Sequence, residues 1–244
     1  MERLLDEHLE KLKTRVIKMC SLVDEQLQFA IKSFEEENLE LANMVIERDK
    51  KVNKYDVKID KICQRIFALA QPVAMDLRYI MSSLTINSNL ERIGDIAVNI
   101  AENVVLIQKK PEFYNNTKLE EMFNLTKRML KNAIDSFIGA NPELAKEVIL
   151  TDDVVDRLNS ENHQILKSIM KQNPDSIEGA VALLVISREL ERLADHSTNI
   201  AEDVFFIVEA QMIKHKYEKY IFGEDENENN NDLQIDDAKE ELNS

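Results

Sequence analysis

The sequence predicts an all-α protein built from two tandem antiparallel three-helix bundles. Glycine and proline number only four each among the 244 residues, so the chain lacks the frequent turns that a β-protein needs. Apolar residues recur at helical spacing along most of the chain. The segment NLERIGDIAVNIAENV, which begins at Asn89, is repeated as ELERLADHSTNIAEDV, which begins at Glu189. A duplicated unit of three long helices joined by short turns would fold as two successive bundles.

Six helices follow from the periodicity, and polar or turn residues mark their boundaries. Asn38 is placed to cap the second helix, and Pro72 precedes or opens the third, where a missing N–H does no harm. Gly139 predicts a helix stop, Asn141 predicts the next cap, and Pro142 suits a first helical position. The predicted helices span residues 3–34, 38–70, 74–109, 117–138, 142–172 and 175–220.

The duplication divides the chain into a first three-helix repeat, 1–112, and a second, 113–222. The polar stretch KKPEFYNNTK, 109–118, has no helical periodicity and is predicted to link the repeats. Residues 223–244 are acidic, rich in asparagine and nearly without large apolar side chains. Such a segment cannot bury enough surface to offset the entropy of ordering, so we predict a disordered acidic C-terminal tail.

Composition and charge narrow the classes of function. The formal net charge is −15, which disfavours nucleic acid and anionic membrane surfaces as partners. The charged N-terminal segment does not resemble a secretory signal, and the longest apolar run, AVALLVI, is too short to span a bilayer. The two cysteines, Cys20 and Cys63, suggest no disulfide framework and are expected to be reduced and buried. A cytoplasmic protein is therefore expected.

Oxygen-bearing side chains occupy matching positions in the two repeats. At 100° per residue, Glu91, Asp95 and their polar neighbours lie within about 80° of one another, opposite an isoleucine stripe. The polar group that includes Asp49 spans about 60° on the preceding helix. Each repeat thus carries two polar ridges on neighbouring helices. Asp49, Asn53, Asp56 and Asp60 match Asp152, Asp156, Asn159 and His163, and Glu91, Asp95, Asn99 and Glu102 match Glu191, Asp195, Asn199 and Glu202.

These ridges have a structural interpretation and a functional one. A solvated face would explain them, and Arg92 and Arg192, each three residues before an aspartate, could form ordinary surface pairs. However, Glu-x-x-x-Asp places two like charges one turn apart in both repeats, which is unfavourable without compensation. Facing ridges would gather several carboxylates, and a bound cation would neutralise them. We therefore predict metal binding.

The ligand types limit the metal and the chemistry. Oxygen-dominated sites suit Mg, Ca, Mn or Fe, or a surface-bound zinc, and do not suit a structural zinc site. No histidine has a glutamate three residues before it, so the di-iron oxidase pattern is missing from the sequence. No glycine-rich phosphate loop or nucleophile triad is evident. His196 falls toward the apolar side of its helix and is expected to be a hydrogen-bonded interior histidine.

The repeated motifs, together with QPVAMDLRYI at residues 71–80, resemble the PhoU family over roughly residues 1–215. The resemblance implies two three-helix bundles and multinuclear metal clusters, Fe or Zn first and Mg, Mn or Ca as alternatives. It also implies a non-enzymatic, often homodimeric, negative regulator of phosphate uptake and of the phosphate-starvation response. The implied partners are the phosphate transporter's ATPase and, in many bacteria, a sensor histidine kinase. Carried onto this sequence, the implied metal ligands are Asp49, Glu91, Asp95, Asp152, Asp156, Glu191 and Asp195.

Two departures from the family pattern weaken the site in the first repeat. Asn53 stands where the second repeat has Asp156, and Ile96 follows Asp95 where the second repeat has His196. Two other interpretations of the same acids stay open. One is a carboxylate-bridged metalloenzyme, such as a hydrolase or oxidase, and the other is a metal-free helical adaptor that uses the ridges to bind a protein.

Overall fold

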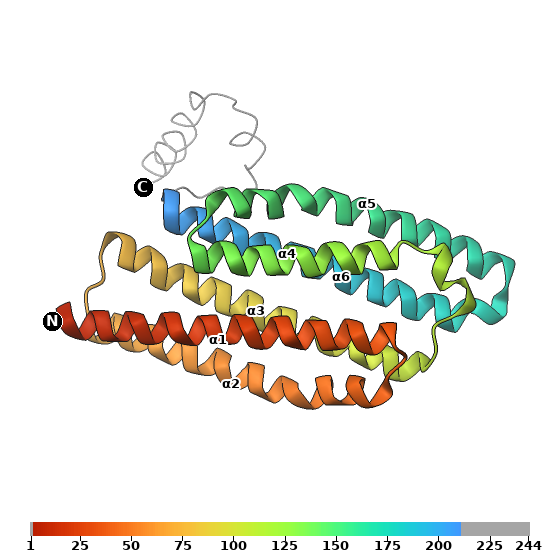
Figure 1. The fold of residues 1–244 in the computed structure, drawn as a ribbon, viewed down its shortest axis with the longest axis horizontal. Helices are drawn as coiled ribbons and strands as arrows, with labels where there is room; N and C mark the ends of the chain where they lie inside the picture. Colours follow the sequence, from red (N-terminus) through yellow and green to blue (C-terminus); the bar gives the residue numbers. More distant parts are fainter. Residues whose placement is uncertain (1, 211–244) are drawn as a thin grey trace, which may run out of the picture. The chain divides into compact units, whose positions relative to one another are not determined.

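The structure, a computed structural model, describes residues 2–210 and, from Leu5 onward, their side chains (Figure 1). The described residues form α-helices and two short 3-10 helices and contain no strand, which confirms the all-α prediction. The predicted acidic tail, 223–244, and the end of the predicted sixth helix, 211–220, lie outside the described residues. The elements are α1 (Glu2–Glu35), α2 (Leu39–Leu69), α3 (Ala74–Ile107), η1 (Glu112–Asn116), α4 (Leu119–Gly139), α5 (Pro142–Gln172), η2 (Pro174–Ser176) and α6 (Ile177–Glu209).

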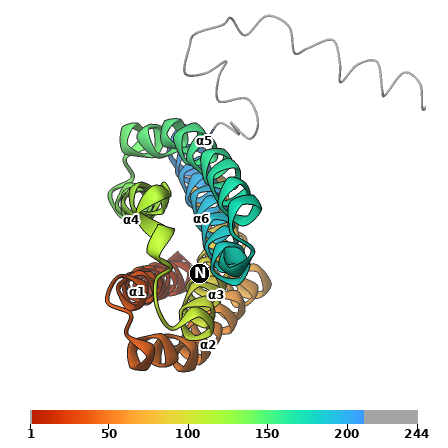
Figure 2. The same ribbon diagram turned by 90° about the vertical axis from the view of Figure 1, so that its right-hand side faces the viewer.

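Two three-helix bundles account for the six described α-helices. The first is formed by α1, α2 and α3, and the second by α4, α5 and α6 (Figure 1). Short connections reverse the chain after each helix, so consecutive helices run antiparallel. The bundles join chiefly along α3 and α6, with a smaller contact between α1 and α4 (Figure 2). This arrangement confirms the tandem-bundle prediction, while the residue boundaries given above for the two repeats stay a prediction.

The helix boundaries follow from local capping. Asn38 and Asn141 each cap a helix, because their side chains accept a hydrogen bond from the backbone N–H of Leu41 and Leu144. The helix stop after α4 differs from the prediction. Gly139 is still helical, and the left-handed conformation falls on Ala140, with φ of 47°. The predicted linker 109–118 also contains the short helix η1.

The core is the apolar stripe that the periodicity indicated. Ile93, Ile96 and Ile100 of α3 are fully buried, as are Cys20 and Cys63. Both cysteines are free thiols, as expected. No helix in the described part of the chain combines the length and apolar character that crossing a membrane demands.

Candidate functional site: two carboxylate faces

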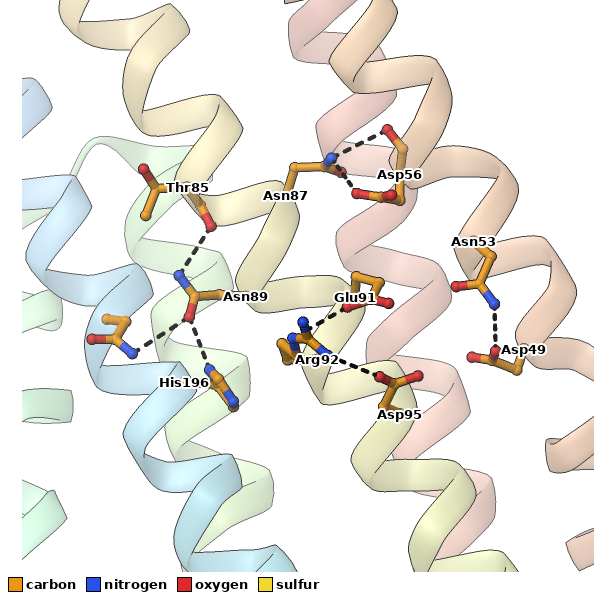
Figure 3. A network of polar contacts seen from close by, with 11 residues as sticks. Asp49, Asn53, Asp56, Thr85, Asn87, Asn89, Glu91, Arg92, Asp95 and His196 are labelled. Atoms are coloured by element: carbon orange, nitrogen blue, oxygen red, sulfur yellow. Dashed lines mark hydrogen bonds and ion pairs between the residues drawn. The ribbon is translucent and has the colours of Figure 1, made fainter.

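The first carboxylate face consists of Asp49 on α2 and of Glu91 and Asp95 on α3 (Figure 3). The three side chains are half-buried. The two helices approach closely here because α3 has a glycine at the crossing. A Cβ atom added to Gly94 would lie 3.0 Å from Val52 Cγ1 and 3.5 Å from Asp49 Oδ1. The missing side chain of Gly94 therefore lets the Asp49 carboxylate sit directly against α3.

Hydrogen bonds satisfy only part of this face. The Asn53 amide donates to Asp49 Oδ2 over 2.7 Å, and Asp49 Oδ1 is buried without a hydrogen-bond partner among the described residues. Arg92 lies 3.6 Å from both Glu91 and Asp95 and is the only cation that pairs with them within residues 2–210 (Figure 3). A buried carboxylate oxygen with no donor is unfavourable. The first face therefore has an unmet requirement for a donor or a cation.

The second carboxylate face consists of Asp152 and Asp156 on α5 and of Glu191 and Asp195 on α6. Its acids occupy the positions equivalent to those of the first face, although Ala194 stands where the first repeat has Gly94. Asp152, the counterpart of Asp49, also has a buried Oδ1 that finds no hydrogen-bond partner in the described structure. The same atom thus lacks a hydrogen bond at equivalent positions of both repeats, although the side chain of Thr198 partly offsets the rise in the pKa of Asp152.

The pKa values show that the carboxylates of each face act on one another. Burial, followed by the charge of Asp95, raises the pKa of Asp49 above its usual range. Burial and the charge of Asp95 also raise the pKa of Glu91, which Arg92 partly offsets. On the second face, burial and then the charges of Asp195 and Asp156 raise the pKa of Asp152 to about 7. Burial is the leading cause in each case.

Glu191, Asp195 and Asp156 share this behaviour. Burial followed by the charge of Asp195 raises the pKa of Glu191, and burial followed by the charge of Asp156 raises the pKa of Asp195. The pKa of Asp156 is raised by burial and then by the charge of Asp153. The acids that the sequence predicted for each face therefore lie near enough for their charges to act on one another.

The second face differs from the first in its charged groups. Asp156 stands where the first face has the amide of Asn53, which adds one carboxylate. The expected pair between Arg192 and Asp195 does not form. Instead, Arg192 Nη1 donates to Glu189 Oε1 over 3.0 Å, one turn earlier on α6. Arg92 thus pairs with the acids of the first face, whereas Arg192 pairs with the nearly buried Glu189. The charge of Arg192 still partly offsets the rise in the pKa of Asp195, and Arg188 and Arg192 do so for Glu191.

Two predicted ridge residues point elsewhere. Asn99 does not join the first face: its amide donates to Glu189 Oε2 over 3.1 Å, across the junction between α3 and α6. Reciprocally, Asn199 of α6 donates to Asn89 Oδ1 of α3 over 3.4 Å. The two pairs are related by the duplication. Angular positions along a helix could not distinguish these asparagines from the acids, because they do not show that α3 and α6 pack against each other at this side.

His196 belongs to the same junction, as expected for a hydrogen-bonded interior histidine. Its Nδ1 donates to Asn89 Oδ1 over 2.9 Å (Figure 3). Burial, followed by the charges of Arg192 and Arg92, lowers the pKa of His196, so the ring is neutral near pH 7. Asn89 and Glu189 were missed as junction residues, although both open the repeated motif and fall on the apolar side of their helices.

A third polar contact was also missed. Asn87 of α3 donates to Asp56 Oδ1 over 2.7 Å (Figure 3). It also donates to Asp60 Oδ1 over 3.2 Å. The second repeat has Ser187 at this position, whose hydroxyl donates to Asn159 Oδ1 over 2.8 Å. Protein donors therefore satisfy Asp56, Asp60 and Asn159, in the second half of the α2 and α5 ridges. The carboxylate oxygens without a hydrogen bond lie in the first half, at Asp49 and Asp152. His163 is exposed on α5.

The donor chemistry fits a metal ion, although the side chains are not gathered around one point. Within residues 2–210, no group of three or more histidine, cysteine, aspartate or glutamate side chains has the arrangement of a metal site. Like-charged carboxylates repel and separate when no cation holds them. The fit rests on the unpartnered Oδ1 atoms of Asp49 and Asp152 and on the raised pKa values around them.

The fold and the two faces define a duplicated helical-bundle protein with paired acidic sites. A family model described as the PhoU domain matches the chain twice, over residues 16–104 and 119–204. The chain belongs to the PhoU family.

Curated PhoU proteins are similar in sequence to this chain over most of its length. The phosphate-specific transport system accessory protein PhoU homolog of Aquifex aeolicus (strain VF5) is 38% identical over 215 residues, which cover 88% of this chain and 97% of that protein. The phosphate-specific transport system accessory protein PhoU of Escherichia coli (strain K12) is 32% identical over 221 residues, which cover 89% and 92%.

Solved structures agree in fold. The crystal structure of PhoU from Pseudomonas aeruginosa matches with a TM-score of 0.81 at 31% identity, covering 84% of this chain and 99% of that one. The phosphate transport system regulatory protein PhoU from Streptococcus pneumoniae matches with a TM-score of 0.75 at 26% identity, covering 85% and 98%.

Proposed function

We propose that this chain is a cytoplasmic, non-enzymatic negative regulator of phosphate uptake and of phosphate-starvation signalling. Its family membership supports this role, since its curated relatives are described as accessory proteins of the phosphate-specific transport system. The similar protein from Streptococcus pneumoniae is described as a regulatory protein of phosphate transport. The proposed partners are the ATPase of a phosphate transporter and a sensor histidine kinase, and the chain is proposed to form a homodimer.

The proposed role includes metal binding on the two carboxylate faces. The observation that carries it is the buried, unpartnered Oδ1 atom at Asp49 and again at Asp152. Iron or zinc clusters are the first candidates, with Mg, Mn or Ca as alternatives. The residues that would hold the ions are Asp49, Glu91 and Asp95 on the first face and Asp152, Asp156, Glu191 and Asp195 on the second.

Each face connects two helices of one bundle, which gives the charge state a mechanical role. Asp49 lies on α2 and its like-charged neighbours lie on α3, so their repulsion acts directly between the two helices. Positive charge at the face removes this repulsion and holds the helices together. The proposed consequence is a stiffer carboxylate surface, with less negative charge, for contact with the partner protein.

The regulatory role is tested in a strain that lacks the gene. Phosphate uptake and the output of a starvation-responsive promoter are measured at high phosphate, and the transporter ATPase is sought in crosslinked pull-downs. The parent gene should restore repression and capture the ATPase. Unchanged uptake and promoter output without the gene, together with no captured ATPase at high or low phosphate, would contradict the proposal.

Two variants with the same net charge distinguish the effect of losing the face carboxylates from the effect of losing negative charge in general. The test variant carries Glu91→Gln, Asp95→Asn, Glu191→Gln and Asp195→Asn and should fail to restore repression. The control removes four exposed acids elsewhere, by Glu47→Gln, Glu121→Gln, Asp135→Asn and Glu147→Gln, and should restore it. Equal repression by both variants would leave the regulatory role standing but would remove the carboxylate faces from it.

A further inference from the structure

A groove between α1 and α2 is lined almost entirely by basic side chains. Its volume is about 490 Å³, and no carboxylate of the described residues lines it. The chain as a whole has a net charge of −15, so the groove is a local reversal of sign. We call this feature the basic groove; it is lined by His8, Lys11 and Arg15 of α1 and by Lys58, Lys61, Ile62 and Arg65 of α2.

The basic groove arises because α2 separates its charges onto opposite sides. At 100° per residue, Lys58, Lys61 and Arg65 lie within about 60° of one another, and Asp56 and Asp60 lie on the opposite side. The contacts agree, since Asp56 and Asp60 accept hydrogen bonds from Asn87 of α3 whereas the basic residues line the groove with α1. The acids of α2 therefore do not neutralise the groove.

The cations of the basic groove pair with no carboxylate in the described part of the chain. Among the described residues, none of its five lysines and arginines forms a salt bridge. Arg15 and Lys58 instead lie over the ring of Tyr55, 5.9 Å and 5.4 Å from its centroid. Like charges on facing helices repel, so this arrangement is unfavourable until an anion enters. A second groove farther along the same helices differs, because Asp24 and Glu25 line it beside its lysines.

The duplicated scaffold does not require the basic groove. The family model begins its two matches at residues 16 and 119, and α4 begins at Leu119 whereas α1 begins at Glu2. The part of α1 that carries His8, Lys11 and Arg15 therefore has no counterpart in α4. On α5, the positions equivalent to Lys58, Lys61 and Arg65 hold Glu161, Gln164 and Ser168. Both repeats keep the carboxylates, but only the first has the basic row.

We propose that the basic groove binds a small soluble molecule that carries two or more phosphate groups. The groove volume lies within the range of about 300–1,000 Å³ that small-molecule sites occupy. On α2 the cations run from Lys58 to Arg65, seven residues apart and about 10 Å at the helical rise, so one phosphate group would reach only part of the row. Lysine and arginine are the side chains that recognise phosphate oxygens.

The total charge of the chain favours a small ligand over an extended one. Screening confines electrostatic interactions to about 8 Å at physiological ionic strength. A molecule inside the groove therefore responds to the five local cations, whereas a membrane or a long polyanion also meets the acidic surface around them. A short inorganic polyphosphate and a nucleoside triphosphate share the required chemistry, and the experiment below distinguishes them.

This proposal is independent of the carboxylate faces. The basic groove and Asp49 lie on opposite sides of α2, so substitutions on one side leave the other unchanged. Failure of metal binding would not affect the groove, and failure of the groove would not affect the proposed regulatory role.

The test is titration calorimetry on the full chain at physiological ionic strength, without divalent cations. The probes are tripolyphosphate, ATP and inorganic phosphate. The groove variant carries Lys58→Gln, Lys61→Gln and Arg65→Gln. The control carries Arg157→Gln, Lys167→Gln and Lys171→Gln, which remove the same charge from exposed positions on α5.

At least one polyvalent probe should bind the parent at least about tenfold more tightly than inorganic phosphate, because more charge-assisted hydrogen bonds form. The groove variant should bind that probe at least about tenfold more weakly, and the control should stay within about twofold of the parent. Stronger binding of ATP would identify a nucleotide, and stronger binding of tripolyphosphate an inorganic chain.

Three results would overturn the proposal: no binding of either polyvalent probe, an equal loss in groove and control variants, or binding only to vesicles that contain anionic lipid. The last result would assign the groove to a membrane surface. Thermal unfolding checks that each variant is folded. If the triple variant is not, the pair Lys61→Gln and Arg65→Gln repeats the test with two exposed side chains.

Discussion

Replacing Asp152 with Asn should stabilise the metal-free protein at pH 8 and have little effect near pH 4. In the folded chain, burial and the charges of Asp195 and Asp156 raise the pKa of Asp152 from 3.8 to about 7. A carboxyl whose pKa is raised on folding contributes stability below its unfolded pKa and loses that contribution as the pH rises through the folded pKa. The parent therefore loses this contribution between about pH 4 and pH 7, and the Asp152→Asn variant has no carboxyl to ionise.

The size of the effect follows from the shift. Each pKa unit corresponds to about 1.4 kcal/mol, so the full shift would give about 4 kcal/mol. Asp152 is only half-buried, and water screens its charge, so we expect the free energy of unfolding to rise by about 2 kcal/mol at pH 8. Urea unfolding in the presence of chelator, from pH 4 to pH 8.5, measures the difference.

The control for this prediction is Asp135→Asn, which removes an exposed carboxylate from α4 and should change the free energy of unfolding by less than about 0.5 kcal/mol at every pH. A stabilisation by Asp152→Asn that did not depend on pH would refute the explanation by buried charge. A loss of stability at pH 8 would show that Asp152 is already compensated in the metal-free chain.

Three further changes test other parts of the structure. The double substitution Asn53→Asp and Asp156→Asn moves one carboxylate from the second face to the first. NMR titration should then show the pKa of Asp49 rising further and the pKa of Asp152 falling toward its usual range. Unchanged pKa values would show that residues 53 and 156 do not act on these two carboxyls. Replacing Ala140 with Gly should raise the free energy of unfolding by about 1 kcal/mol, because Ala140 has a φ of 47°; no gain in thermal unfolding would show that the turn is not strained. Replacing Glu189 with Ala should cost about 1–3 kcal/mol, because Asn99 and Arg192 lose their acceptor, whereas Glu189→Gln should cost less; equal costs would argue against that network.

The sequence predicted the architecture well because its signals are local. Apolar spacing located the six helices, and Asn38 and Asn141 marked two starts that the structure shares. The exception is the end of the sixth helix, predicted at residue 220, because α6 ends at Glu209 and Ala210 has a left-handed conformation. The C-terminal stop of α4 was harder to place. A glycine at 139 suggested the left-handed residue, but the chain uses Ala140 and ends the helix one residue later.

The candidate site was predictable in composition but not in pairing. The duplication identified which acids recur, and the wheel identified the face that they share. It could not show that Arg192 pairs with Glu189 and not with Asp195, nor that Asn99 contacts α6, because both depend on how the bundles pack together. It also could not show that a missing side chain at Gly94 brings Asp49 against α3.

The basic groove was not predicted at all. Lysines at helical spacing ordinarily indicate a solvated face, and a net charge of −15 does not predict a local basic site. Its recognition needed the position of α1 beside α2 (Figure 1), which places two basic rows on either side of one groove.

The carboxylate faces are tested most directly by the metal content of the untagged protein, purified without chelator and measured by elemental mass spectrometry. The parent is compared with the Glu91→Gln, Asp95→Asn, Glu191→Gln, Asp195→Asn variant, and circular dichroism confirms that both are folded. We predict stoichiometric metal in the parent and its loss in the variant. No metal in the parent, even after reloading with iron, zinc, manganese, magnesium and calcium in turn, would contradict the metal sites and leave the paired acids as a surface for protein contact.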